Sequence, residues 1–202
     1  MGLLTVRTPP TRSAGRNHMK GNPDPARTCA ELRALGSRPP NAVRRRAVVD
    51  ALGSRFESVQ VVAAQILGKW GGRDAVEGLR RLLVRAMAKD AYGAVARQAA
   101  EALAECVEPR DAGWVLDLFA AAPFLGKHTL APVVRALPVE LTGDRLKAEC
   151  RSTRRENRHG AMIAMNGLAI PGKRKVYEAL TRDSDPTIRE VATAFLSSDR
   201  LP

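Results

Sequence analysis

Apolar residues recur every three or four positions along most of the chain, which is the spacing of one face of an α-helix. No stretch alternates apolar and polar residues for long enough to indicate a β-strand. The pattern therefore predicts an all-α protein. From the capping residues, glycines and prolines that bound them, helices are expected at 30–35, 42–52, 57–70, 74–87, 91–106, 111–121, 126–137, 144–150, 155–168, 173–181 and 186–196.

Five of these expected helices share a second pattern. Each has a small or β-branched residue four positions after its start and a leucine eight positions after it. In the first copy these residues are Ala63 and Leu67, and Gly68 follows the leucine. The copies start at Val59, Val95, Thr129, Gly160 and Ile188, at separations of 36, 34, 31 and 28 residues.

A recurring unit of this length predicts a stack of helix pairs. Residues at offsets of zero, four and eight lie on one helix face, and small residues there let a neighbouring helix approach closely. One pair cannot bury its own apolar face, so neighbouring pairs must stack. We therefore expect a curved, right-handed α-solenoid of about five helix pairs, with the second helix of each pair lining the concave face.

The residues that open the last copy resemble the HEAT and HEAT-like (PBS-lyase-type) repeat superfamily. The match is the run from Asp185 through Pro186 to Arg189, followed by Ala192 and Leu196. The resemblance spans residues 42–198 and departs from the family pattern at Pro132 and in the polar run 151–158. It implies a repeat architecture and no particular catalytic residue, since fold alone does not assign chemistry.

The first part of the chain differs from the rest. Residues 1–25 have several prolines, scattered arginines and no apolar period, so we expect a disordered basic tail there and a repeat domain over 26–202. Met19 precedes Lys20 and resembles an alternative start, so we expect residues 1–18 to be either an over-extended start or a dispensable tail. No apolar run approaches the roughly 20 residues of a membrane span, so no membrane association is expected.

Motifs for catalysis, cofactors and metals are missing from the sequence, and we predict none of the three. His128 and His159 have no second histidine or cysteine at helical spacing. The three cysteines form no CxxC pair, which favours reduced, buried thiols in a cytoplasmic protein. The acidic residues of 101–117 are expected on a solvated helix face, and Trp70 and Trp114 at the edge of the core.

Basic clusters are the one feature that suggests a binding surface. The net charge is +12, and the excess lies towards the two ends of the chain, on either side of a slightly acidic segment 91–144. No aromatic residues interleave with the basic ones, which argues against stacking on single-stranded bases. The candidate binding residues are Arg44, Arg45, Arg46, Arg154, Arg155, Arg158, Lys173, Arg174 and Lys175.

These observations predict a non-catalytic macromolecular binding module, a scaffold or adaptor for a protein partner. Two alternatives stay open. The basic clusters could bind nucleic acid, or the chain could be a HEAT-like enzyme such as a DNA glycosylase or a chromophore lyase. A deep cleft with Trp114 and a buried carboxylate would favour the enzyme. We expect a monomer, because the terminal helices are predicted to be short caps.

Overall fold

The computed structural model describes residues 24–198, which are helical with short connections and contain no strand. The prediction of an all-α fold is confirmed over this range. The elements are α1 (Pro25–Gly36), α2 (Ala42–Ala51), α3 (Glu57–Trp70), α4 (Arg73–Lys89), α5 (Ala94–Ala104), the 3₁₀ turn η1 (Pro109–Asp111), α6 (Ala112–Ala121), α7 (Phe124–Arg135), α8 (Val139–Glu149), α9 (Arg155–Met165), α10 (Lys173–Leu180) and α11 (Pro186–Ser198).

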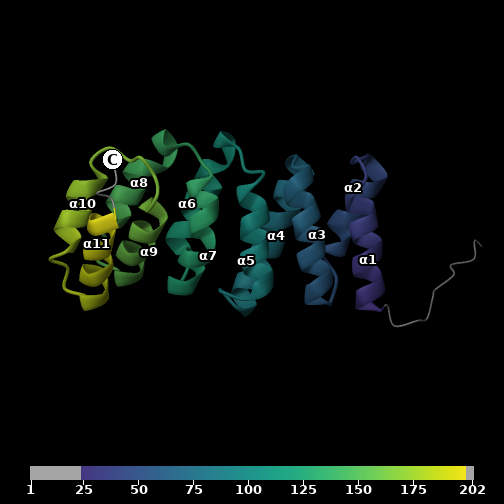
Figure 1. Cartoon of the computed structure of the whole chain (residues 1–202), viewed down its shortest axis with the longest axis horizontal. Helices are drawn as coiled ribbons and strands as arrows, with labels where there is room; N and C mark the ends of the chain where they lie inside the picture. The colour runs from purple at the N-terminus through teal and green to yellow at the C-terminus, as the bar shows by residue number, and fades with distance from the viewer. Residues whose placement is uncertain (1–23, 199–202) are drawn as a thin grey trace, which may run out of the picture.

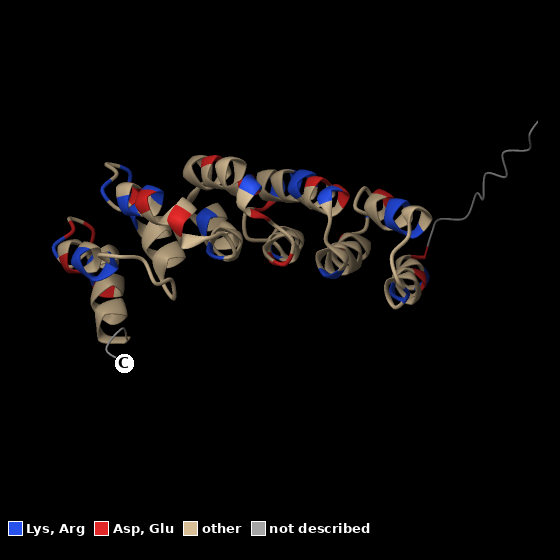
Figure 2. Ribbon diagram, turned by 90° about the horizontal axis from the view of Figure 1, so that it is seen from above, with Lys and Arg blue, Asp and Glu red and all other residues tan. Residues whose placement is uncertain are grey.

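The helices form two rows along an elongated stack (Figure 1). The odd-numbered row packs in chain order, with α3 between α1 and α5, and α7 between α5 and α9. Each even-numbered helix packs against the odd-numbered helix that follows it, which gives five pairs after α1 within the described residues. Figure 2 shows the stack curving, with the odd-numbered row on the inside of the curve. Packing between helices that are neighbours in sequence agrees with the predicted α-solenoid, whose right-handed sense stays a prediction.

The residue at offset four of the repeated pattern lies in each odd-numbered helix from α3 to α11. Ala63, Ala99, Val133, Ala164 and Ala192 occupy this position, and all of them are 0% exposed. Their burial explains why the position excludes long side chains in every copy. The sequence pattern thus identified the core of the stack.

Close contacts between neighbouring odd-numbered helices require glycine at two further positions. A Cβ on Gly68 of α3 would lie 2.9 Å from the Ala102 Cα on α5. A Cβ on Gly160 of α9 would lie 2.3 Å from Cδ of Lys127 on α7. Both distances are shorter than van der Waals contact, so these glycines set the spacing of the row.

Several element boundaries differ from the prediction. The first helix begins at Pro25, because Asp24 accepts a hydrogen bond from the Ala26 amide and caps the helix. The eighth begins at Val139 rather than at residue 144. Pro132 lies inside α7 and does not end it. The disorder predicted for the N-terminal tail concerns residues that lie almost entirely outside the described range.

The premise of the monomer prediction is wrong. The two terminal helices of the described range, α1 and α11, have 12 and 13 residues and are not short caps. The oligomeric state therefore stays a prediction without this support. Among residues 24–198, no helix combines the length and the apolar character that crossing a membrane requires.

Candidate functional site

One of the three successive arginines on α2 is engaged within the fold. Arg45 reaches the C-terminal end of α3, where Nη1 donates to the Gly71 carbonyl at 2.7 Å and Nη2 to the Trp70 carbonyl at 3.0 Å. Nη1 also pairs with Asp74 at 3.0 Å. The last carbonyls of a helix have no partner inside it, and a guanidinium is well suited to satisfy them. Arg45 thus links α2 to the end of α3 and the start of α4.

The neighbours of Arg45 are less constrained. Arg44 donates from Nη1 to the carbonyl of Pro39, in the loop that precedes α2, at 2.7 Å. Arg46 is exposed and has no side-chain partner among the described residues. Of the predicted cluster on α2, Arg46 is therefore the residue with its charge fully available.

Arg158 on α9 is bound within the fold more strongly than any other predicted binding residue. Its Nε and Nη2 donate to the two carboxylate oxygens of Asp183 at 2.7 and 2.8 Å, and Nη1 donates to the carbonyls of Ser152 and Thr153. The two charged side chains are 13% and 7% exposed. The hydrogen bond from Arg158 lowers the pKa of Asp183, so the carboxylate stays ionised. This pair fastens α9 to the loop before α11.

Arg155 makes a second link to the same loop. Its Nε lies 2.6 Å from a carboxylate oxygen of Asp185, and its guanidinium is 5.9 Å from the Phe124 ring centre. Asp185 also caps α11, since it accepts hydrogen bonds from the second and third residues of that helix. Arg154, one residue earlier, is exposed and has no side-chain partner in the described part of the chain.

The basic residues that open α10 also have different environments. Arg174 forms an exposed ion pair with Glu178, one turn further on, at 3.1 Å. The Lys173 ammonium lies 5.9 Å from the ring centre of Tyr177. Lys175 is exposed and lines a groove between α8 and α10. Lys175 therefore places a positive charge beside this groove.

The predicted residues do not form one site. The α2 cluster lies at one end of the stack, and the residues on α9 and α10 lie at the other (Figure 1). Exposed carboxylates, among them Glu101, Glu105 and Asp117, lie on the elements between the two ends. Two separate basic ends with an acidic middle are therefore the electrostatic pattern of the molecule.

The acidic segment contains a buried carboxylate that the sequence did not predict. Asp111 is 1% exposed, so the expected solvated face is wrong for this residue. It accepts hydrogen bonds from Arg73 Nη1 at 2.7 Å, Trp114 Nε1 at 3.0 Å and the Glu108 amide at 3.0 Å. These donors, together with the Arg73 charge, lower the pKa of Asp111 although its burial opposes them. Its oxygens are fully engaged in joining α4 to α6.

A buried lysine holds α7 against α6. Lys127 is 0% exposed, and its ammonium donates to the carbonyls of Phe119 and Ala120 at the C-terminal end of α6. The negative end of a helix dipole favours a cation at this place. Burial nevertheless lowers the pKa of Lys127 to about 8. Sequence reasoning had no signal for this residue, because a lysine is normally exposed.

Two histidines that are distant in sequence meet at the α7–α9 contact. The rings of His128 and His159 have centres 5.3 Å apart, and both lie about 5 Å from the ring of Phe124. Burial lowers both pKa values, so the rings are neutral near pH 7. Their separation equals the local repeat length, 31 residues, which is the signal that could have predicted the contact. Within residues 24–198, no group of three potential ligands could hold a metal ion.

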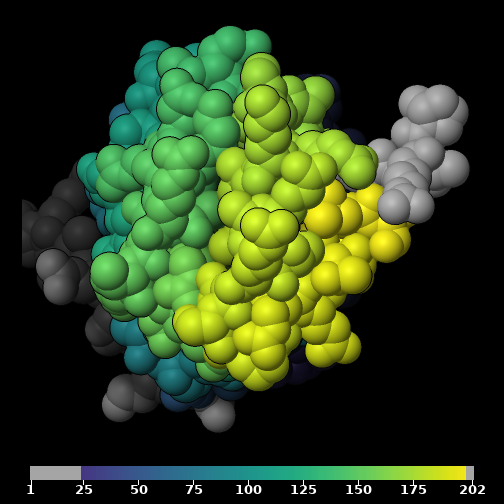
Figure 3. Space-filling view, turned by 90° about the vertical axis from the view of Figure 1, so that its left-hand side faces the viewer, coloured from purple at the N-terminus to yellow at the C-terminus, as the bar shows by residue number. Residues whose placement is uncertain are grey.

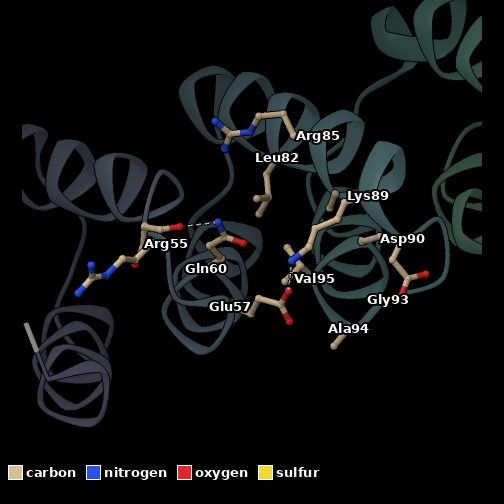
Figure 4. A pocket seen from close by; sticks show the side chains of 13 residues that line it. Arg55, Glu57, Gln60, Leu82, Arg85, Lys89, Asp90, Gly93, Ala94 and Val95 are labelled. Carbon is tan, nitrogen blue, oxygen red and sulfur yellow. Dashed lines mark hydrogen bonds and ion pairs between the residues drawn. The ribbon is translucent and has the colours of Figure 1, made fainter.

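A cavity of about 380 Å³ opens where α3, α4 and the start of α5 meet (Figure 4). Its main polar side chains are paired with neighbours. Lys89 Nζ lies 2.8 Å from a Glu57 carboxylate oxygen, and Gln60 Nε2 donates to the Ser54 carbonyl at 2.6 Å. None of the predicted binding residues lines this cavity. Its lining is of mixed charge, with Arg55, Arg85 and Lys89 beside Glu57 and Asp90.

Two of the described cysteines, Cys106 and Cys150, have thiols whose pKa is raised. Cys29 and Cys150 are buried, and no disulfide occurs among the described cysteines. Burial raises the pKa of Cys106 to about 11 and that of Cys150 to about 12. A thiol with such a pKa is protonated at neutral pH and is a poor nucleophile.

Comparison with known proteins adds no further assignment. No protein-family model matches the sequence, and a search of curated proteins finds no significant relative. The resemblance to HEAT-like repeats therefore rests on the residue pattern alone.

Proposed function

We propose that this chain is a non-catalytic docking module for a protein partner, and that it uses the end of the stack formed by α8 to α11. One observation carries the proposal. At this end, Arg154 and Lys175 are exposed without side-chain partners in the described chain, and Lys175 stands on the rim of a groove with an apolar floor. Protein interfaces combine an apolar centre with a polar rim.

The arrangement of charge supports a protein over a nucleic acid as the partner. A duplex would draw affinity from many phosphate contacts along a continuous basic surface. Here the two basic ends are separated by elements with exposed carboxylates, and Arg45, Arg155 and Arg158 are each held by a carboxylate of the chain itself. The number of cations left for phosphates is correspondingly small.

The enzyme alternative gains no support from the buried carboxylate. That alternative called for a deep cleft with Trp114 and a buried carboxylate, and Asp111 is such a carboxylate beside Trp114. Neither residue lines the cavity at α3 to α5 or the groove between α8 and α10, and Asp111 accepts hydrogen bonds from three donors. A carboxylate so engaged is a structural link between helices.

We also infer that the stack is of the HEAT-like kind. The run from Asp185 to Arg189 has a clear physical role in support of this. Asp185 is the N-cap of α11, and Pro186 occupies its first position, where a missing N–H has no consequence. The buried small residue in every odd-numbered helix from α3 to α11 points to the same architecture.

Fluorescence anisotropy with labelled duplex DNA, single-stranded DNA and structured RNA tests the proposal against its main alternative. We expect binding at low salt that is lost at physiological salt, because only unspecific contacts to phosphates are formed. Binding that persists at physiological salt, and that weakens in Arg154→Ala and Lys175→Ala but not in Arg46→Ala, would replace the proposal with nucleic-acid recognition. Arg46 is the matched control, an exposed and unpartnered arginine at the other end.

A further inference from the structure

The groove between α8 and α10 has a composition that restricts what can occupy it. It has a volume of about 300 Å³ and lies at the C-terminal end of the stack, where Figure 3 shows the green surface of α8 beside the yellow-green surface of α10. Its charged lining, here called the rim, is Lys147 of α8, Arg151 in the turn after α8 and Lys175 of α10, and its apolar lining on α10, here called the floor, is Val176, Ala179 and Leu180. No carboxylate lines it.

Two of the three rim cations are available to a ligand, and the third has partners within the fold. Arg151 and Lys175 are exposed and have no side-chain partner among residues 24–198. Lys147 is 25% exposed, pairs with Asp144 at 2.7 Å and donates to the Pro171 carbonyl at 3.4 Å, but the Asp144 carboxylate is 96% exposed. An ion pair so open to solvent is weak and is easily exchanged for another carboxylate. Glu149, the acidic residue next to Cys150 of the groove, is turned towards Arg145 at 3.5 Å.

The three cations come from different parts of the fold. Lys147 lies in the last turn of α8, Arg151 lies in the turn that follows the end of α8 at Glu149, and Lys175 lies in the first turn of α10. The first turn of α10 begins at Gly172 without a side-chain cap, so the positive end of its dipole lies at the same groove. Carboxylates carried by one short segment would match this rim in charge.

We propose that this groove binds an acidic segment of a protein partner, with carboxylates on the rim cations and an apolar side chain on the floor. The assignment rests on the proposed docking function and names its site and the chemistry of its partner. The apolar floor favours a peptide over a nucleic acid, because the lining has no aromatic ring on which a base could stack. Electrostatic complementarity at the rim would fix the register of the segment.

Selection from a library of short random peptides, displayed and panned on the immobilised full chain at physiological salt, tests the assignment. The comparison proteins are the double variant Arg151→Glu/Lys175→Glu and the control Arg46→Glu, which makes the same kind of charge reversal at the other end. A second groove variant, Ala179→Phe, fills the floor without changing charge. Circular dichroism melts of all proteins establish that each is folded.

We expect the wild type and Arg46→Glu to enrich peptides with at least two Asp or Glu residues and at least one large apolar residue. Individual enriched peptides should bind the double variant about ten-fold or more weakly, since two attractive rim contacts become repulsive. Ala179→Phe should also weaken them, which a purely electrostatic attraction would not produce.

The other outcomes overturn the assignment in distinguishable ways. Enriched peptides that bind the double variant as tightly as the wild type would leave the docking function intact and exclude this groove. If the wild type enriches no peptide more strongly than the double variant does, the groove is also excluded as the docking site. If no peptide is enriched and a duplex DNA binds at physiological salt with the same dependence on Arg151 and Lys175, both the assignment and the proposed function fail.

Discussion

Replacing Asp183 tests whether Arg158 is a structural residue or a binding residue. The Asp183 carboxylate accepts hydrogen bonds from Nε and Nη2 of Arg158 and from the Asp185 amide, the last at 2.8 Å. The variant Asp183→Ala leaves the guanidinium with a buried charge and only two carbonyl partners. The variant Asp183→Asn keeps the shape but places an amide N–H₂ opposite a group that can only donate.

The magnitude follows from the burial of the pair. Removing one member of a buried ion pair costs about 3–5 kcal/mol, since the remaining charge stays desolvated. With exposures of 13% and 7%, the Arg158–Asp183 pair belongs to this class. Asp183→Asn should cost about 2–3 kcal/mol, because the carbonyl oxygen retains part of the interaction. The exposed pair of Arg174 and Glu178 is the control, and Arg174→Ala should change the free energy of unfolding by less than about 0.5 kcal/mol.

The effect of pH gives an independent signature. Arg158 lowers the pKa of Asp183 in the folded protein, whereas the unfolded chain has the ordinary value. The stabilisation is thus complete above the unfolded pKa of about 4 and is lost as the pH falls through the lower, folded value. The difference between wild type and Asp183→Asn should be constant near neutrality and should shrink below about pH 4.

Urea unfolding followed by circular dichroism measures these free energies, and hydrogen exchange of α9 to α11 shows where stability is lost. The second measurement matters because repeat stacks can unfold in parts. A free energy for Asp183→Ala within about 0.5 kcal/mol of wild type would refute the structural role of the pair. Arg158 would then be as available for binding as the exposed Arg154.

Three further predictions follow from the packing. Gly160→Ala should destabilise the protein by about 1–3 kcal/mol in thermal melts, because its Cβ would overlap the Lys127 stem, whereas Gly113→Ala, with open space around it, should not. Arg45→Ala should cost about 1–2 kcal/mol by urea unfolding through the lost helix-end contacts, and Arg46→Ala less than about 0.5. Burial lowers the pKa of Lys127 from 10.5 to about 8, so the unfolded chain binds more protons than the folded one between these two pH values. Differential scanning fluorimetry should therefore show that wild type gains stability relative to Lys127→Met as the pH rises from about 8 to about 10.5.

The helices and the core could be predicted from the sequence because they depend on spacing. The residue at offset four in each copy is buried wherever the pattern places it, including the degenerate copies with Val133 and Ala164. The same spacing contained the contact of His128 with His159, which lie one position before successive copies. This contact was not predicted, because partners for each histidine were considered three or four residues away and not one repeat length away.

The roles of individual charged residues could not be predicted, because they depend on loops. Arg45 and Arg46 are adjacent and chemically identical, yet only Arg45 lies beside the open carbonyls at the end of α3. Asp111 is the last residue of η1 and accepts hydrogen bonds from Trp114 and Arg73. The apolar spacing along the chain does not predict this buried position. The groove between α8 and α10 likewise requires two outer helices to be placed in space before its rim and floor can be recognised.

Hydrogen exchange of the full chain with and without a selected acidic peptide, at physiological salt, tests the central claim most directly. The account predicts slower exchange confined to α8, α10 and the segment 151–154 that follows α8, and loss of this protection in Arg151→Glu/Lys175→Glu. Protection of α2 to α5, or protection that the double variant retains, would contradict docking at this end of the stack.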